Sequence, residues 1–175
     1  MSLLSTATLA ASLLTLAPAA LPAAPATAGG ILWTVPARWT AGAGSSMRVA
    51  TYAIPAARGA EPGECAVFFF GTGQGGGVDD NVARWAKQFE GAPAPKSAAA
   101  TVAGMRVTRA EVAGTYLAPG GPMMQSTGKK TGYRLLGAIV EAPSGNVFFK
   151  LTGPASTVGT AQAEFEALVA SIRKK

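Results

Sequence analysis

Hydrophobic residues in the first half of the chain form short runs and alternating stretches, a pattern that is typical of β-strands. Residues 46–54 (SMRVATYAI) alternate and are rich in strand-forming side chains. Residues 65–70 form a continuous apolar run between two glycines, which predicts a central strand covered on both faces. A short extended segment at 31–36 ends in a proline, which cannot donate a ladder hydrogen bond. We therefore expect three strands in this part of the chain.

The hydrophobic period changes from strand-like to helical in two places. The first predicted helix starts at the acidic pair Asp79 and Asp80, runs for about eleven residues and ends at Gly91. The second starts near Thr157 and closes the chain. The apolar positions that recur at helical spacing are Val82, Trp85, Ala86 and Phe89 in the first helix, and Phe165, Leu168, Val169 and Ile172 in the second.

The region between the two helices predicts hairpins and loops. Residues 92–100 (APAPKSAAA) are of low complexity and predict an exposed connection. A hairpin is expected over 101–116, and a second over 133–152, around the turn sequence PSGN. Residues 117–132 follow neither period and predict a long loop. Because consecutive hairpins pair antiparallel, we expect an α+β domain with a mainly antiparallel, twisted sheet and two packed helices.

The N-terminal 28 residues carry no charged side chain and predict a secretory signal peptide. An apolar run at 9–16 precedes Ala26-Thr27-Ala28, a small-x-small pattern after which cleavage is expected. The run is too short to span a bilayer, which takes about 20 apolar residues, so no transmembrane segment is expected in the mature chain. The absence of Lys or Arg at the start of the leader counts against the prediction. Residues 29–175 would form a single domain, exported to the periplasm or beyond.

Composition narrows the range of functions. The 175 residues include no histidine, which excludes Ser-His and Cys-His catalytic pairs and nearly all catalytic zinc sites. The single cysteine, Cys65, lies in the apolar run and is expected to be a buried hydrophobe. Glu61 and Glu64 are among the carboxylates that could act as acids or bases, but no catalytic set is recognisable. No cofactor and no metal site are expected.

The chain carries Lys+Arg 15 against Asp+Glu 9, a net charge of +6. Such an excess can serve nucleic-acid binding, but the interleaved aromatic residues and recognisable modules of nucleic-acid-binding proteins are missing. No nucleic-acid partner is therefore expected.

A glycine-rich turn between the apolar run and the first helix is one candidate ligand site. Its sequence GTGQGG satisfies the G-x-G-x-x-G pattern, which can cradle a phosphate at a helix N-terminus. However, Asp79 and Asp80 would repel a phosphate there, and the acidic residue expected about twenty positions later is missing. A turn that requires positive φ angles is the preferred interpretation. The candidate ligand-binding residues are Gly71, Gly73, Gln74, Gly75 and Gly76.

A second candidate is a partner-binding surface in and beside the predicted loop 117–132. Two adjacent methionines stand near three cations, and together they would form a flexible apolar and basic patch if exposed. Alternatively, the methionines fold back over the core. The residues of this candidate surface are Met123, Met124, Lys129, Lys130 and Arg134.

Three features together resemble the PsbP-like superfamily. These are the segment 33–39 (WTVPARW), a helix between the third strand and the later hairpins, and the closing pattern Phe165-x-x-Leu168-x-x-Ser171. That group includes extrinsic photosystem subunits, exported bacterial proteins and a Ran-binding import factor. The resemblance implies an α/β/α sandwich with a binding or assembly role. It transfers no functional residue, because the metal-binding histidines of some members have no counterpart here.

These observations lead to two functional hypotheses. The first is an exported, non-enzymatic binding or assembly module with a protein or cell-envelope partner. The alternative is a small-ligand or phosphate-binding protein, or an enzyme, that uses the turn at 71–77.

Overall fold

The computed structural model describes residues 26–43, 45, 47–118 and 128–175. Two helices and ten strands are assigned within these ranges. The helices are α1 (Val78–Ala86) and α2 (Ala155–Ala170). The strands are β1 (Ala26–Ala28), β2 (Ile31–Trp33), β3 (Thr40–Ala41), β4 (Ala50–Ile54), β5 (Gly63–Phe69), β6 (Lys96–Val102), β7 (Met105–Ala118), β8 (Gly128–Ala142), β9 (Gly145–Pro154) and β10 (Arg173–Lys174).

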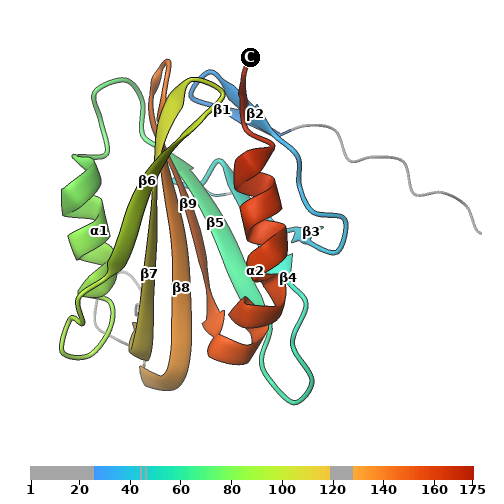
Figure 1. The fold of residues 1–175 in the computed structure, drawn as a ribbon. Coiled ribbons are helices and arrows are strands. Elements are labelled where there is room, and N and C mark those ends of the chain that lie inside the picture. Colours follow the sequence, from blue (N-terminus) through green and yellow to red (C-terminus); the bar gives the residue numbers. More distant parts are fainter. Residues whose placement is uncertain (1–25, 44, 46, 119–127) are drawn as a thin grey trace, which may run out of the picture.

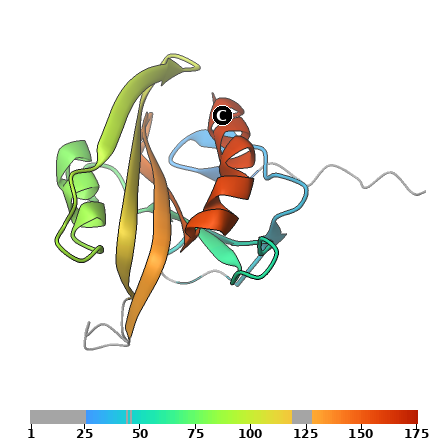
Figure 2. The ribbon, with the colours of Figure 1, turned by 60° about the horizontal axis from the view of Figure 1, so that its bottom comes forward.

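A seven-stranded sheet forms the middle layer, with α1 on one face and α2 on the other (Figures 1 and 2). Its strand order is β3-β4-β5-β9-β8-β7-β6, and a small second sheet has the order β1-β2-β10. Every pairing between the described strands is antiparallel. The predicted α+β class, with an antiparallel sheet between two packed helices, is therefore confirmed.

The face of the sheet under α2 is a closed hydrophobic core. Cys65 and Val67 of β5 and Phe149 and Leu151 of β9 are fully buried there against α2. The small sheet adds a further cover on this side, since the Trp33 ring packs edge-on against Phe149 with the ring centroids 5.1 Å apart. Strand β5 therefore has the internal position expected for the apolar run at 65–70. The expectation that both of its faces are covered is wrong, because Ala66 and Phe68 on the opposite face line a cavity.

The opposite face is covered by α1 only in part. Trp85 lies directly on β8, where a Cβ added to Gly137 would stand 2.0 Å from the Trp85 ring. The bare backbone of a glycine therefore sets the position of the helix. Figure 1 shows α1 to the left of the sheet, with β7 and β8 extending below it. Below α1, no helix of the described residues covers this face.

Helix α1 ends earlier than the predicted limit near Gly91. After Ala86 the chain turns to the edge of β7, where the Glu90 N–H donates to the Thr115 carbonyl (2.9 Å) and the Leu117 N–H donates to the Gln88 carbonyl (2.8 Å). Main-chain hydrogen bonds to the sheet replace those that would have continued the helix. Phe89 is nevertheless buried, at 1% exposure, as its spacing predicts.

Two predicted connections prove to be strands over part of their length. Residues 96–100 of the predicted connection 92–100 belong to β6, although they are exposed as expected. Small residues without alternation give no strand signal, and β6 forms through its main-chain pairing with β7. The predicted loop 117–132 is shorter, because Leu117 extends β7 opposite Lys129 of β8. Residues 119–127, with Met123 and Met124, lie outside the described residues.

The predicted signal peptide lies mostly outside the described residues as well, and its cleavage stays a prediction. Ala26–Ala28, which precede the predicted cleavage point, form β1 and pair with β2. Among the helices of the described ranges, none is long and apolar enough to cross a membrane.

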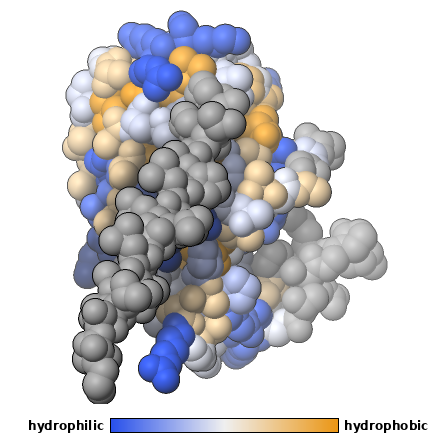
Figure 3. All heavy atoms as spheres, turned by 90° about the vertical axis from the view of Figure 1, so that its right-hand side faces the viewer, coloured by the Kyte–Doolittle hydropathy of each residue, from blue (hydrophilic) through white to orange (hydrophobic). Residues whose placement is uncertain are grey.

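The basic end of the chain is exposed. Figure 3 shows the side of α2, with hydrophilic residues gathered at the end of the molecule where the chain terminates. There Arg173 and Lys174 form β10 beside β2, and the Lys175 N–H donates to the Gly30 carbonyl (3.0 Å). The terminal cations are thus held at the surface by main-chain pairing.

Candidate functional site

The uncovered part of the α1 face contains a cavity of about 530 Å³, which we call the sheet pocket. Strands β5 and β9 form its floor, the segment that precedes β4 and the loop that precedes β5 form one side, and β7 and β8 form the other. Eight of its lining residues carry the charges and the aromatic surface described below: Arg48, Glu61, Glu64, Phe68, Tyr116, Lys130, Tyr133 and Lys150.

Strand alternation explains which side chains reach the pocket. In β9, Phe149 and Leu151 point towards α2, so Lys150 and Thr152 point to the opposite face. In β5, Ala66 and Phe68 do the same, and Ala66 pairs directly with Lys150 in the register of β5 and β9. The floor therefore combines an apolar strip on one strand with two polar side chains on the next.

Two ion pairs lie at the edge of the pocket. The Arg48 Nη1 atom lies 2.8 Å from Glu64 Oε1, and the Arg48 guanidinium also lies over the Phe68 ring. On the other side, the Lys130 ammonium and the Tyr133 hydroxyl both donate to Glu61 Oε2, at 2.7 and 2.6 Å. The hydrogen bond to Glu61 raises the pKa of Lys130 to about 12, and the same bonds lower the pKa of Glu61. Both edge cations are thus neutralised.

Lys150 differs from these edge cations because it is partly buried in the floor and forms no ion pair with a carboxylate of the described residues. Its Nζ donates to Gln88 Oε1 at 2.6 Å and lies 3.4 Å from the Tyr116 hydroxyl, close to the Tyr116 ring. Burial, with a smaller contribution from the nearby Arg48, lowers the pKa of Lys150 to about 8. The floor therefore presents a cation without an acidic partner.

A second polar group of β9, close to Lys150 in sequence, has no hydrogen-bond partner among the described residues. This group is the Thr152 hydroxyl, whose oxygen is buried. Buried polar atoms are nearly always hydrogen-bonded, so an exception in a pocket calls for an explanation. The hydroxyl and the ammonium lie on the same face of β9, and Glu64 of β5, which is paired with Arg48, stands opposite Thr152.

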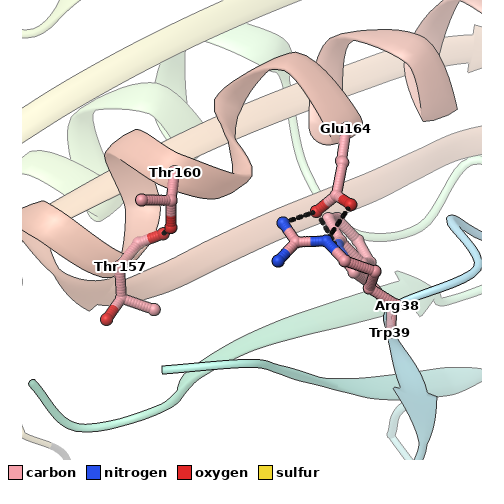
Figure 4. Close-up of polar contacts among 5 residues, drawn as sticks. All are labelled: Arg38, Trp39, Thr157, Thr160 and Glu164. Carbon is pink, nitrogen blue, oxygen red and sulfur yellow. Dashed lines mark hydrogen bonds and ion pairs between the residues drawn. The ribbon is translucent and has the colours of Figure 1, made fainter. Parts of the chain in front are cut away.

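The loop that carries Glu61 is tied to the first turn of α2. Thr157, which is fully buried, donates from its hydroxyl to the Glu61 carbonyl (2.8 Å) and accepts from the Ala57 N–H (3.1 Å). Figure 4 shows Thr157 on α2, with the Thr160 hydroxyl directed at the Thr157 carbonyl. One side of the pocket is thus held by the helix that packs on the opposite face of the sheet.

The sequence-predicted glycine turn lies outside the lining of the sheet pocket. Four of its candidate residues have positive φ angles: Gly71, Gly73, Gly75 and Gly76. The turn is held against the β8–β9 hairpin, since the Thr72 hydroxyl donates to the Ser144 carbonyl (2.9 Å). A Cβ on Gly75 would lie 2.8 Å from the Phe70 ring. The positive φ angles and the close packing therefore explain why glycine occupies these positions. Ligand binding by these glycines and by Gln74 stays a prediction.

The Asn81 side chain closes the turn at the start of α1. Its amide nitrogen donates to the Gly75 and Gly77 carbonyls, both at 2.8 Å. Asp79 and Asp80 occupy the first turn of α1, but no side chain caps the helix by a hydrogen bond. Their contribution there is an interaction with the helix dipole.

The cations of the predicted partner surface lie in three different environments. Lys129 forms an ion pair with Glu90, and Lys130 lines the sheet pocket. Arg134 pairs with Glu111 at 2.9 Å on the other face of the sheet, and its side chain is only 17% exposed. With Met123 and Met124 outside the described residues, the partner surface stays a prediction.

Other chemically reactive groups lie apart from the pocket. Cys65 is fully buried on the α2 face, and burial raises the pKa of its thiol. Within the described ranges, no group of three or more potential metal ligands is present.

Sequence reasoning placed Lys130 in a candidate partner surface and did not single out Lys150, Thr152 or Arg48, which line the sheet pocket with it. One signal could have found Lys150, since it is the single charge within the strand sequence VFFKLT. Its companions in the pocket carry no such signal. They come together through strand register and through a loop distant in sequence.

Comparison with known proteins supports the fold. No protein-family model matches the sequence, and no curated protein matches it. Among solved structures, the chain is similar to the cyanobacterial PsbP from Synechocystis sp. PCC 6803, with a TM-score of 0.53 and 11% identity over 84% of this chain and 88% of that one. A protein of unknown function from Pseudomonas aeruginosa is 14% identical over 79% of this chain and 87% of its own, but its TM-score of 0.47 is too low to support an argument. The fold is PsbP-like, as the sequence features predicted.

Proposed function

We propose that this protein is an exported, non-enzymatic binding module that holds its ligand in the sheet pocket. The observation that carries the proposal is the cavity on the α1 face, where Lys150 has no carboxylate partner and the Thr152 hydroxyl has no hydrogen-bond partner among the described residues. A cavity of about 530 Å³ is within the range of small-molecule sites, roughly 300–1,000 Å³. Few polar groups in a mainly apolar cavity are typical of such sites.

The rigidity of the pocket also supports binding. Its floor consists of β5 and β9, which have hydrogen-bonded strands on both sides. Thr157 ties the Glu61 loop to α2. A preformed site loses little conformational entropy when it takes up a ligand.

A non-enzymatic role follows from the chemistry that the chain lacks. The sequence has no histidine, and the Cys65 thiol is buried away from the pocket. A binding or assembly role is also what the PsbP resemblance implies. Export rests on the predicted signal peptide alone.

A titration with Nile red, a neutral apolar dye, tests whether the pocket binds ligands. We expect saturable binding at one site, and at least a tenfold loss of affinity in Ala66→Phe, which fills the floor. The control is Ala167→Phe on the exposed side of α2, which should bind as the unchanged protein does. Equal affinity in both variants, or no saturable binding at all, contradicts the proposal.

The outer edge of β6 favours a second candidate function, binding of a protein partner by strand addition. Strand β6 is the last strand of the large sheet, and six of its seven residues are exposed. Its small side chains leave the edge accessible, and open edges of this kind accept a strand from another chain.

Cross-linking of a tagged protein in its native envelope tests this second function. A reproducible protein partner should be recovered, and Ala98→Lys on β6 should abolish its recovery because a charge on an edge strand opposes pairing. The matched variant Ala167→Lys on α2 should leave it unchanged. Equal recovery from both variants, or none above an untagged control, rules out the edge as the site.

A further inference from the structure

The charges of the sheet pocket indicate which ligand it accepts. Arg48 is paired with Glu64, and Lys130 with Glu61, so these four groups cancel. Lys150 remains as the one cation of the pocket without a carboxylate partner among the described residues. The pocket therefore has one positive charge to compensate, and an incoming anion would compensate it.

The unused hydrogen-bonding capacity lies at the same point. A lysine ammonium has three donors, and the Nζ of Lys150 has one short bond, to Gln88, and one long contact, to Tyr116. At least one donor remains for a ligand. The unpartnered Thr152 hydroxyl belongs to the residue two positions along the same face of β9, and its oxygen is buried beneath the pocket surface.

Around this polar point the pocket is apolar and aromatic. Ala66 and Phe68 continue the floor along β5, and the rings of Tyr116 and Tyr133 stack at 5.8 Å on the other side. An aliphatic or aromatic body fits against these surfaces while a polar head reaches Lys150.

We propose that the sheet pocket binds an amphipathic carboxylic acid, with its carboxylate held by Lys150 and its apolar body lying on Ala66, Phe68 and Tyr116. This inference rests on the proposed function, because it concerns the same pocket. Because the other charges of the pocket cancel in pairs, Lys150 provides one positive charge, which the single charge of a carboxylate balances and the double charge of a phosphate exceeds.

The affinity should depend on pH through Lys150. The charged or titratable groups around it are Arg48 and Glu64 as an ion pair, Glu61 paired with Lys130, and Tyr116 and Tyr133. Burial raises the pKa of both tyrosines, the pKa of Glu61 is lowered, and that of Lys130 is about 12. Lys150, with a pKa of about 8, therefore loses its proton while Glu61 stays ionised and while Lys130, Tyr116 and Tyr133 keep their protons.

The sign of the effect follows from the charged form of Lys150, which is the form that attracts a carboxylate. Affinity for the carboxylate should be constant between about pH 6 and pH 7, where ligand and Lys150 are both ionised. It should fall up to about tenfold for each pH unit above 8, because binding must then include the uptake of one proton.

The decisive experiment compares ligands that share one tail: decanoate, decanol and decyl phosphate, each displacing Nile red from the full chain at pH 7. We expect decanoate to bind at least tenfold more tightly than decanol and more tightly than decyl phosphate. Lys150→Met should remove the preference for decanoate and leave decanol unchanged. The control Lys87→Met, at an exposed lysine beside Gln88, should keep the preference.

A second variant separates the charge of Lys150 from its role in folding. Lys150→Arg keeps a positive charge at high pH, so decanoate binding by this variant should persist at pH 10, where the unchanged protein has lost it. Equal binding of decanoate and decanol overturns the carboxylate assignment and leaves the proposed function intact. Stronger binding of decyl phosphate also overturns it, whereas failure of Nile red and all three ligands to bind overturns the proposed function itself.

Discussion

The two faces of the large sheet differ although the same strands form both. On the α2 face, Phe149 and Leu151 of β9 are fully buried under a helix of 16 residues and the small sheet. On the other face, Lys150 and Thr152 of the same strand lie beyond the end of α1, which has 9 residues. The length and position of a covering helix thus decide whether a sheet face becomes a closed core or a pocket. Strand alternation decides which side chains point to each face, but it does not decide whether that face becomes a closed core or a pocket.

The largest effect is expected from the closed face. Phe149→Ala removes a fully buried ring that packs against Trp33, and should lower the free energy of unfolding by about 3–5 kcal/mol. Chemical denaturation measures this change in the free energy of unfolding. Phe70→Ala, at a ring that is 42% exposed on the other face, is the control and should cost about 1 kcal/mol or less. Equal losses from the two variants would contradict the contrast between the faces.

The next effect concerns the contact that positions α1. In Gly137→Ala the new Cβ would stand 2.0 Å from the Trp85 ring, so the helix must shift, at a cost of about 1–3 kcal/mol. Denaturation together with tryptophan fluorescence measures both the loss and the shift.

Gly159→Ala is the matched control for this variant. Gly159 lies in α2, and a Cβ there meets no atom within 4 Å. Alanine in a helix interior is favoured over glycine by roughly 0.5–1 kcal/mol, so this variant should be more stable than the unchanged protein. The hypothesis fails if the two substitutions act in the same direction.

A smaller effect is expected from the link between the two faces. Thr157→Val removes the hydroxyl that donates to the Glu61 carbonyl and accepts from the Ala57 N–H, at a cost of about 1–2 kcal/mol. Binding of Nile red should weaken as well, because one side of the pocket loses its anchor. Thr160→Val, which removes only a hydrogen bond within α2, should leave dye binding unchanged. Unaltered binding in both variants would show that the anchor is irrelevant to the pocket.

The smallest effect is a pH dependence at the surface of α2. Glu164 accepts from Arg38 and from the Trp39 indole (Figure 4), and the bond from Arg38 is the main reason that its pKa is lowered. The ionised carboxylate therefore stabilises the fold above about pH 4.3, its unfolded value, and this contribution is lost as the pH falls through the lower folded value. Denaturation at pH 7 should distinguish the protein from Glu164→Gln by a small margin that disappears near pH 2. A margin that grows in acid would refute this assignment.

Much of the fold could be predicted because its elements follow a clear hydrophobic period. Alternation indicated β4, a continuous apolar run indicated β5, and the turn sequence PSGN indicated the hairpin of β8 and β9. Helical spacing indicated the buried faces of both helices. Strand β6 could not be predicted, since its run of small residues has no period and its pairing with β7 alone makes it a strand. The end of α1 was missed because main-chain bonds to the edge of β7 compete with the helix there.

The candidate site was less accessible to prediction. Lys130 and Glu61 are 69 residues apart in sequence and meet only when a loop before β5 folds against β8. Lys150 was detectable as a charge in an apolar strand, but its lack of an acidic partner depends on how the surrounding charges pair. Sequence analysis proposed the glycine turn instead, because a local motif can be recognised without knowledge of the tertiary contacts.

The sequence by itself determined the class of the fold, the absence of histidine chemistry and the burial of Cys65, since each follows from composition or from local periodicity. Only the tertiary structure decided which part of the sheet stays open. That outcome depends on the contact of Trp85 with the bare backbone at Gly137 and on the early end of α1. These are packing events between residues far apart in the chain, and no local pattern encodes where a short helix comes to rest on a long sheet.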